Sequence, residues 1–123
     1  RLEGLTRIYK VPVICSEFVK NDIEKSVQGH GLRFIELDTV MVKGKTIGKK
    51  VYWPVLESEI DKKLHAELEN FSGGLELYYN GDWKKAYRYF SKCTLPAAEV
   101  FKDRTKNNDC PKRWNGIWEM TTK

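Results

Sequence analysis

Two extended runs of the chain predict a β-hairpin: Phe34-Ile35-Glu36-Leu37-Asp38-Thr39-Val40-Met41-Val42 and Lys50-Val51-Tyr52-Trp53-Pro54-Val55-Leu56. In the first run, apolar and polar side chains alternate with a period of two, as on a strand with one buried face. The residues between the runs are polar and include Gly44 and Gly48, which is typical of a hairpin turn. Pro54 cannot donate a ladder hydrogen bond, so we expect the second strand to lie at an edge or to be ending there.

Upstream of the hairpin, the pattern predicts the end of a helix, a short strand and a second helix. Leu2, Leu5 and Ile8 are three residues apart, as on one face of a helix. The β-branched run at residues 11–15 predicts a strand. Ser16 has the side chain of a helix cap, and apolar residues then follow at helical spacing until glycines at 29 and 31 break the chain. We expect residues 1–56 to form one structural unit.

Downstream of Leu56 the pattern is helical, and we treat residues 57–104 as a second unit. Small residues alternate with large ones at the spacing of two closely packed antiparallel helices: Gly74, Gly81, Ala86 and Cys93 with Leu77, Tyr78 and Phe90. This spacing resembles one tetratricopeptide repeat, with helices over residues 60–79 and 83–93 and a turn at Gly81-Asp82. Pro96 is expected to open a third helix over residues 96–102. Such an array is too short to stand alone, so we expect it to pack on another part of the structure.

The final segment, residues 105–123, is polar and then aromatic. Trp114, Ile117 and Trp118 lie close together in the sequence. Because large apolar side chains are rarely left in solvent, we expect this tail to return and cover apolar surface.

Composition excludes some function classes and leaves others open. The chain has 123 residues and a formal net charge of +5, and no run approaches the ~20 apolar residues that span a bilayer. The basic excess lies in residues 1–56, which hold 10 basic and 6 acidic side chains, against 12 and 11 in residues 57–123. Four lysines lie in or next to the predicted hairpin turn: Lys43, Lys45, Lys49 and Lys50. Without any ligand, such lysines are explained by a solvated turn in which they protect an edge strand from pairing with other chains. The three cysteines are far apart in the sequence and are expected to be reduced thiols of a cytosolic protein.

No self-contained active site can be assembled from the spacing of the residues. His30 lies between two glycines and His65 on a charged helix face, so both are expected to be surface residues. The phosphate-binding P-loop pattern is missing from the sequence. The best candidate is a cationic surface facing phosphate groups, made by Arg1 and the Lys43 region.

Several stretches of residues 1–56 together resemble a known enzyme family. They are Arg1-Leu2-Glu3-Gly4-Leu5-Thr6, Val11-Pro12-Val13-Ile14-Cys15-Ser16-Glu17 and the run from Phe34 to Lys45, with Val42-Lys43-Gly44-Lys45 the most specific element. The chain resembles the C-terminal half of the class III adenylyl/guanylyl cyclase catalytic domain. The helical repeat and the ending Trp114-Asn115-Gly116-Ile117-Trp118-Glu119-Met120-Thr121-Thr122-Lys123 resemble the tail of some bacterial adenylyl cyclases.

The resemblance implies roles for two residues. Arg1 matches the arginine that ends the family's Asn-x-x-x-Arg motif, which stabilises charge on the α-phosphate as the ribose 3′ oxygen attacks it. Lys43 matches the first lysine of the Val-Lys-Gly-Lys turn, which contacts the terminal phosphates of ATP. Fixed positive charge at these positions suits phosphoryl transfer.

The same resemblance implies that parts of the site lie outside this chain. The two metal-binding aspartates of the family precede Arg1, so we expect a C-terminal fragment that is inactive alone, of a parent enzyme that uses Mg²⁺ or Mn²⁺. The site is expected to lie between two catalytic domains of a homodimer. The resemblance also implies a cytoplasmic location, in a parent that is often tethered by an upstream membrane-spanning region.

The implied fold is α+β: a partial ferredoxin-like cyclase sheet, built as strand, helix and hairpin, followed by an α-helical hairpin tail. Because the other strands of such a sheet precede Arg1, an apolar edge and face would be left open. We expect them to be covered by self-association, by strand exchange, or by the tail folding over them.

Two alternatives to the cyclase reading remain at this point. The helical repeat and the Trp-rich tail could be a protein–protein interaction module with the cyclase-like half as a scaffold. Nucleic-acid binding through the basic hairpin is weaker, because aromatic side chains are not interleaved with the lysines as base stacking requires. Nothing in these residues reads the base, and ATP is preferred to GTP only because the tail resembles that of adenylyl cyclases.

Overall fold

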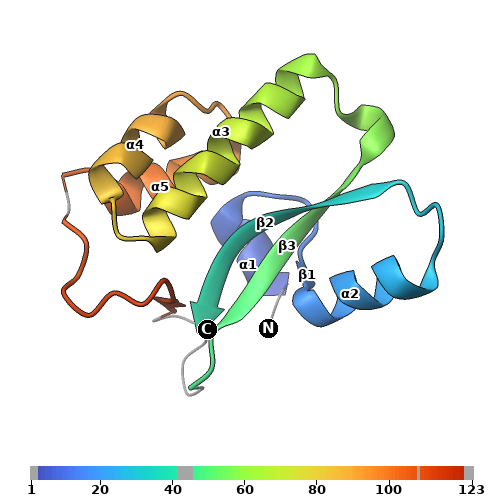
Figure 1. Ribbon diagram of the computed structural model, residues 1–123, viewed down its shortest axis with the longest axis horizontal. Coiled ribbons are helices and arrows are strands. Elements are labelled where there is room, and N and C mark those ends of the chain that lie inside the picture. Colours follow the sequence, from blue (N-terminus) through green and yellow to red (C-terminus); the bar gives the residue numbers. More distant parts are fainter. Residues whose placement is uncertain (1–2, 42–45, 108, 121–123) are drawn as a thin grey trace.

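The structure is a computed structural model that describes residues 3–41, 46–107 and 109–120 (Figure 1). The expectation of a mixed α+β fold is confirmed. In chain order the elements are α1 (Glu3–Tyr9), β1 (Cys15–Ser16), α2 (Glu17–Ser26), β2 (Leu32–Met41), β3 (Lys49–Leu56), a 3-10 turn (Glu57–Glu59), α3 (Lys62–Tyr79), α4 (Trp83–Ser91), α5 (Pro96–Thr105) and β4 (Trp118–Glu119). No helix among the described residues is long and apolar enough to cross a membrane.

The sheet is built around the predicted hairpin. Its four strands have the order β1-β3-β2-β4, with β2 and β3 antiparallel and β4 parallel to β2. The register shifts between Glu36 and Asp38, so Leu37 forms a bulge in β2. β1 pairs only with Val51 and Tyr52, so Pro54 lies on a stretch of β3 that β1 does not reach, and β3 ends two residues later. Both observations agree with the edge position expected for a proline.

The strand predicted over residues 11–15 is much shorter in the structure. Only Cys15–Ser16 pairs with β3, and Val11 N–H instead donates to the carbonyl of Thr6 at the end of α1. Pro12 has no N–H to offer a neighbouring strand, and Val13 and Ile14 also precede the paired residues. Ser16 is the helix cap, as predicted: its Oγ accepts the N–H of Val19 at 3.1 Å.

The predicted helical hairpin is confirmed with small changes of boundary. α3 starts at Lys62, where the Asp61 carboxylate accepts the N–H of Leu64, and α5 continues three residues beyond the expected end at Lys102. Gly81 adopts φ +92° in the turn before α4, a conformation that favours glycine. A Cβ at Gly74 would lie 3.0 Å from the ring of Phe90, so the small residue permits the close approach of α3 and α4.

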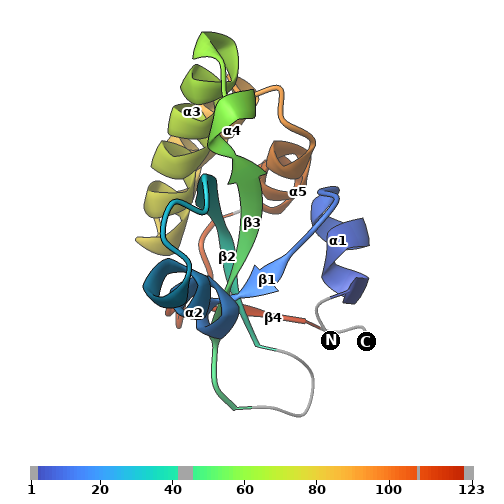
Figure 2. The same ribbon diagram turned by 90° about the vertical axis from the view of Figure 1, so that its right-hand side faces the viewer.

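A single hydrophobic core joins α1, the sheet, the three helices α3, α4 and α5, and the C-terminal tail, whereas α2 has no buried residue. Figure 1 shows α3, α4 and α5 gathered on one side of the β2–β3 hairpin, away from α2, and Figure 2 shows α1 beside α5. The core includes Tyr9 of α1, Leu37 of β2, Phe71 of α3 and Phe101 of α5, each no more than 1% exposed. The helical array thus packs on the sheet, as expected of an array too short to stand alone.

The C-terminal tail returns to the sheet, as the tryptophan-rich sequence predicted. Trp114 Nε1 donates to the carbonyls of Tyr78 and Tyr79 at the end of α3. Trp118 belongs to β4, which pairs with Val40 and Met41 and so covers the last two residues of the β2 edge. Of the expected ways of covering that edge, the structure therefore contains the tail; self-association of copies stays a prediction.

Candidate functional site

The two residues predicted to meet a nucleotide, Arg1 and Lys43, both lie outside the described residues. The last described residue before Lys43 is Met41, at the end of β2, and the chain is described again from Thr46.

Both sides of the Lys43 turn contact the C-terminal tail. On the β2 side, Trp118 pairs with Val40, and Met120 N–H donates to the Met41 carbonyl at 2.9 Å. On the β3 side, Ile117 lies so close to Gly48 that an added Cβ would be 2.7 Å from Ile117 Cδ1. The tail thus contacts the described chain both before and after residues 42–45.

Among the described residues, a buried and extensively hydrogen-bonded ion pair joins β2 to α5. Arg104 Nη1 donates to Asp38 Oδ2 at 2.8 Å, with side-chain exposures of 7% and 0%. Arg104 also donates to the hydroxyls of Tyr78 at 3.0 Å and Tyr9 at 3.2 Å. Tyr9 in turn donates to the Asp38 carboxylate, and Thr39 N–H supplies a further hydrogen bond at 2.8 Å.

Burial dominates the acid–base properties of this cluster. It raises the pKa of the Asp38 carboxyl, against the opposing effects of Arg104 and of the hydrogen bonds from Tyr9 and Thr39. Burial also raises the pKa values of Tyr9 and Tyr78, with a further upward contribution from Asp38. Burial acts to lower the pKa of Arg104, but Asp38 and the two tyrosines reverse this, so the guanidinium stays charged.

The cluster stabilises the fold, and we call its residues Asp38, Arg104, Tyr9 and Tyr78 the structural lock. Among the described residues, no buried side-chain nitrogen or oxygen is left without a partner. Trp118 closes the outer side, because the Arg104 guanidinium carbon lies 3.9 Å from the centre of its ring. The ion pair therefore links α1, β2, α3, α5 and the tail, and its groups are already satisfied by one another.

Three cavities on the described surface contain charged or polar side chains. A cavity of about 400 Å³ lies over the lock and is lined by Lys10, Asp103, Arg104 and Trp118 among others. A second of about 410 Å³, between α2, the hairpin and α3, includes Lys20, Glu36 and Tyr52; burial and then Glu36 raise the pKa of Tyr52 to about 12.

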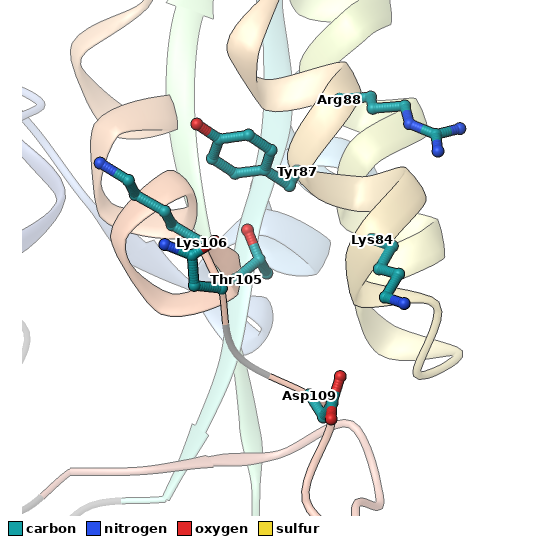
Figure 3. Close-up of a pocket in the computed structure, with 7 residues that line it drawn as sticks. Lys84, Tyr87, Arg88, Thr105, Lys106 and Asp109 are labelled. Carbon is teal, nitrogen blue, oxygen red and sulfur yellow. The ribbon is translucent and has the colours of Figure 1, made fainter.

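The largest of the three cavities is cationic. It has a volume of about 550 Å³, lies beside α4 and the end of α5, and is lined by Lys84, Tyr87, Arg88, Thr105, Lys106, Asn107 and Asp109 (Figure 3). Three cationic side chains and one carboxylate belong to this lining. Its chemistry suits an anionic ligand.

Other candidate ligands in the sequence have structural partners. His30 Nδ1 accepts the N–H of Leu32 at 2.9 Å, and His65 lies 3.9 Å from Glu69 on α3. Cys15, Cys93 and Cys110 are all free thiols. No group of three or more His, Cys, Asp or Glu side chains that could hold a metal ion is found within residues 3–41, 46–107 and 109–120. The expectation that the metal ligands lie elsewhere in a parent enzyme stays a prediction.

Sequence reasoning missed the buried cluster. Asp38 and Arg104 are 66 residues apart, and neither belongs to a spacing pattern that marks a site. The one local signal was Asp38 itself, a charged residue between Leu37 and Thr39 in a predicted strand. Comparisons with protein-family models, characterised proteins and solved structures return no match for the chain, so the cluster and the cationic cavity are interpreted from their own geometry.

Proposed function

We propose that this chain is the C-terminal part of a class III nucleotide cyclase catalytic domain, from a parent enzyme that converts ATP to 3′,5′-cyclic AMP and pyrophosphate. The observation that carries the proposal is the motif Val42-Lys43-Gly44-Lys45, which falls in the sequence between the two strands of an antiparallel hairpin. We expect a lysine in the segment that connects two paired strands to meet phosphate groups beyond the end of the sheet.

The order of the N-terminal elements supports the same proposal. Helix α1, the short β1, helix α2 and the β2–β3 hairpin follow one another as the resemblance implies for the partial ferredoxin-like sheet. In the sequence, Arg1 is two residues before the start of α1, and Lys43 is two residues after the end of β2. In the proposed enzyme, Arg1 stabilises the charge that develops on the α-phosphate, and Lys43 binds the leaving pyrophosphate.

The proposed reaction needs groups that this chain does not supply. Mg²⁺ or Mn²⁺ would polarise the 3′ oxygen and neutralise the phosphates, held by aspartates of a second catalytic domain in a homodimer. The chain alone is therefore expected to form no cyclic AMP. Neither nucleic acid nor membrane contact is part of the proposal for this region.

The test is a cyclic nucleotide assay on the parent protein, with ATP and GTP side by side and Mg²⁺ or Mn²⁺ present. Arg1→Ala should lower turnover by about 100-fold or more, because it removes charge stabilisation from the transition state. Lys43→Ala should act mainly by raising the KM for ATP. Arg7→Ala and Lys49→Ala, at exposed cations near each position, serve as matched controls and should leave the rate unchanged. Wild-type activity in Arg1→Ala would contradict the proposal.

A mixing experiment tests the shared site. A parent variant that lacks the upstream metal-binding aspartates is combined with the Arg1→Ala variant, each inactive alone. Heterodimers carry one intact site, so activity should return on mixing. No return of activity in confirmed heterodimers would refute a site formed between two catalytic domains.

The interaction-module alternative is narrowed by the packing of the tail. Trp83, Trp114 and Trp118 all contact other parts of this chain: Trp83 and Trp114 pack around Tyr78, and Trp118 packs on Arg104. A partner would therefore meet the outer surface of the helices rather than these rings.

A further inference from the structure

Helix α4 divides into one apolar and one cationic face. Trp83, Ala86 and Phe90 are no more than 5% exposed and pack into the core. Four cations occupy the opposite side and are exposed: Lys84, Lys85, Arg88 and Lys92. At about 100° per residue, these four fall within about 100° of the helix circumference, directly opposite the buried face. We call these four residues the α4 cationic stripe.

The charge of the α4 cationic stripe is not neutralised within the described chain. No Asp or Glu lies within α4 itself. None of the four cations forms a salt bridge with a described residue, whereas Lys102 on the neighbouring helix α5 pairs with Glu99 at 3.5 Å. A row of exposed, unpaired cations attracts anionic partners.

A cavity and two tyrosines border the stripe. Tyr87 lies on one side of it, half-buried, and Tyr89 on the other, 41% exposed. Figure 3 shows the ring of Tyr87 directed toward α5 beside the cationic cavity, and Lys84 and Arg88 directed away from α5. The cations are therefore spread along the helix on one side of the cavity instead of converging on one point.

The distribution of the cations along α4 favours an extended anionic ligand over a compact one. A single small anion would need the cations to converge, and they do not. An extended chain with several carboxylates could lie along the stripe and place one side chain in the cavity beside Tyr87, since tyrosine and arginine are favoured contact residues at protein interfaces. We propose that the α4 cationic stripe is the docking surface for an acidic polypeptide segment of a partner protein.

Broader polyanions fit this surface less well. The carboxylates of Asp82, at the start of α4, and Asp109, in the cavity lining, border the stripe. A DNA duplex or an anionic membrane would cover these carboxylates together with the lysines, and a flat membrane could not enter the cavity. A single peptide chain is narrow enough to keep its carboxylates on the stripe while an apolar side chain enters the cavity that Asp109 lines.

The experiment measures binding of a fluorescent Glu-rich peptide with one phenylalanine to the intact chain at low ionic strength. The triple variant Lys84→Gln/Arg88→Gln/Lys92→Gln should bind about tenfold more weakly, since each exposed charge pair contributes modestly. Lys25→Gln/Lys62→Gln/Lys63→Gln removes the same charge from exposed positions on α2 and α3 and should change affinity by less than about twofold. Circular dichroism checks that both variants remain folded, as expected for surface substitutions.

Each alternative outcome overturns the proposal. Equal weakening in both triple variants would show general charge attraction, and no peptide binding would remove the docking surface. Tighter binding of a short DNA duplex or of phosphatidylserine vesicles would assign the stripe to a different partner. Because binding is the readout, the result is independent of cyclase activity, and the proposed function can fail or succeed separately.

Discussion

Replacing Arg104 by methionine should strongly destabilise the protein. The change removes the guanidinium that lies 2.8 Å from Asp38, a carboxylate with 0% exposure. Tyr9 and Thr39 would still donate to this carboxylate, but its charge would be uncompensated. Breaking one partner of a buried ion pair costs about 3–5 kcal/mol. That loss is a large share of the roughly 5–15 kcal/mol by which a domain is usually stable.

A double-mutant cycle separates the ion pair from simple loss of packing. Asp38→Leu alone should cost about 3–4 kcal/mol, because it leaves Arg104 without its counter-charge. The double variant Asp38→Leu/Arg104→Met buries no unpaired charge and should lie within about 1–3 kcal/mol of the wild type. The expected coupling free energy is therefore about 3 kcal/mol or more. If a single variant fails to fold, a double variant that folds still shows that the two substitutions are coupled.

Urea unfolding at pH 7, followed by circular dichroism and tryptophan fluorescence, measures the cycle. Lys102→Met is the matched control on the same helix: its partner Glu99 is at 3.5 Å and both side chains are partly exposed, so the loss should stay below about 1 kcal/mol. Strictly additive single variants, or a loss at Arg104 no larger than at Lys102, would refute the assignment of a structural lock.

Three further predictions test other parts of the fold. Gly74→Val should destabilise the protein by about 1–3 kcal/mol in urea unfolding, because its Cβ would meet the Phe90 ring at 3.0 Å, whereas Gly4→Ala, with no atom within 4 Å, should be nearly neutral; equal losses would contradict the close helix approach. Ser16→Ala removes the cap of α2 and should speed amide hydrogen exchange in that helix about fivefold, equivalent to about 1 kcal/mol, while Ser26→Ala at the opposite end should not. Burial raises the pKa of the Cys93 thiol from 9.0 to about 11, so its alkylation by iodoacetamide, followed by peptide mass mapping, should keep accelerating up to about pH 11 in the folded protein and level off near pH 9 in urea. Stability due to the neutral thiol is complete below about pH 9 and is lost as pH rises through about 11; a folded-state plateau near pH 9 would refute this.

Local patterns in the sequence predicted most of the secondary structure. Period-two alternation around a polar turn identified the β2–β3 hairpin, and Ser16 was recognised as a cap from its side chain and the helical spacing after it. The small–large spacing around Gly74 predicted the α3–α4 pair. These features were accessible because they depend on residues that are neighbours in the chain. The strand over residues 11–15 failed because an apolar run does not reveal which of its N–H groups will find a partner.

Some residues of the candidate sites could be predicted from the sequence, and others are brought together only by packing. Arg1 and Lys43 came from a resemblance carried by short motifs, and both lie outside the described residues. The α4 cationic stripe could be read from helical periodicity once α4 was known, because its residues share one face of one helix. Its neighbouring cavity could not, since Lys106 and Asn107 reach it only through the packing of α5 beside α4.

A hairpin, a capped helix and a closely packed helix pair can be predicted from the residue pattern alone, since each follows from contacts within a short stretch of chain. The pairing of Arg104 with Asp38, and the parallel pairing of the tail with the last two residues of β2, emerged only from the assembled fold. The physical reason is that a charge pair becomes strong when both groups leave water together. That desolvation is a property of the assembled core and has no signature in the spacing of residues along the chain.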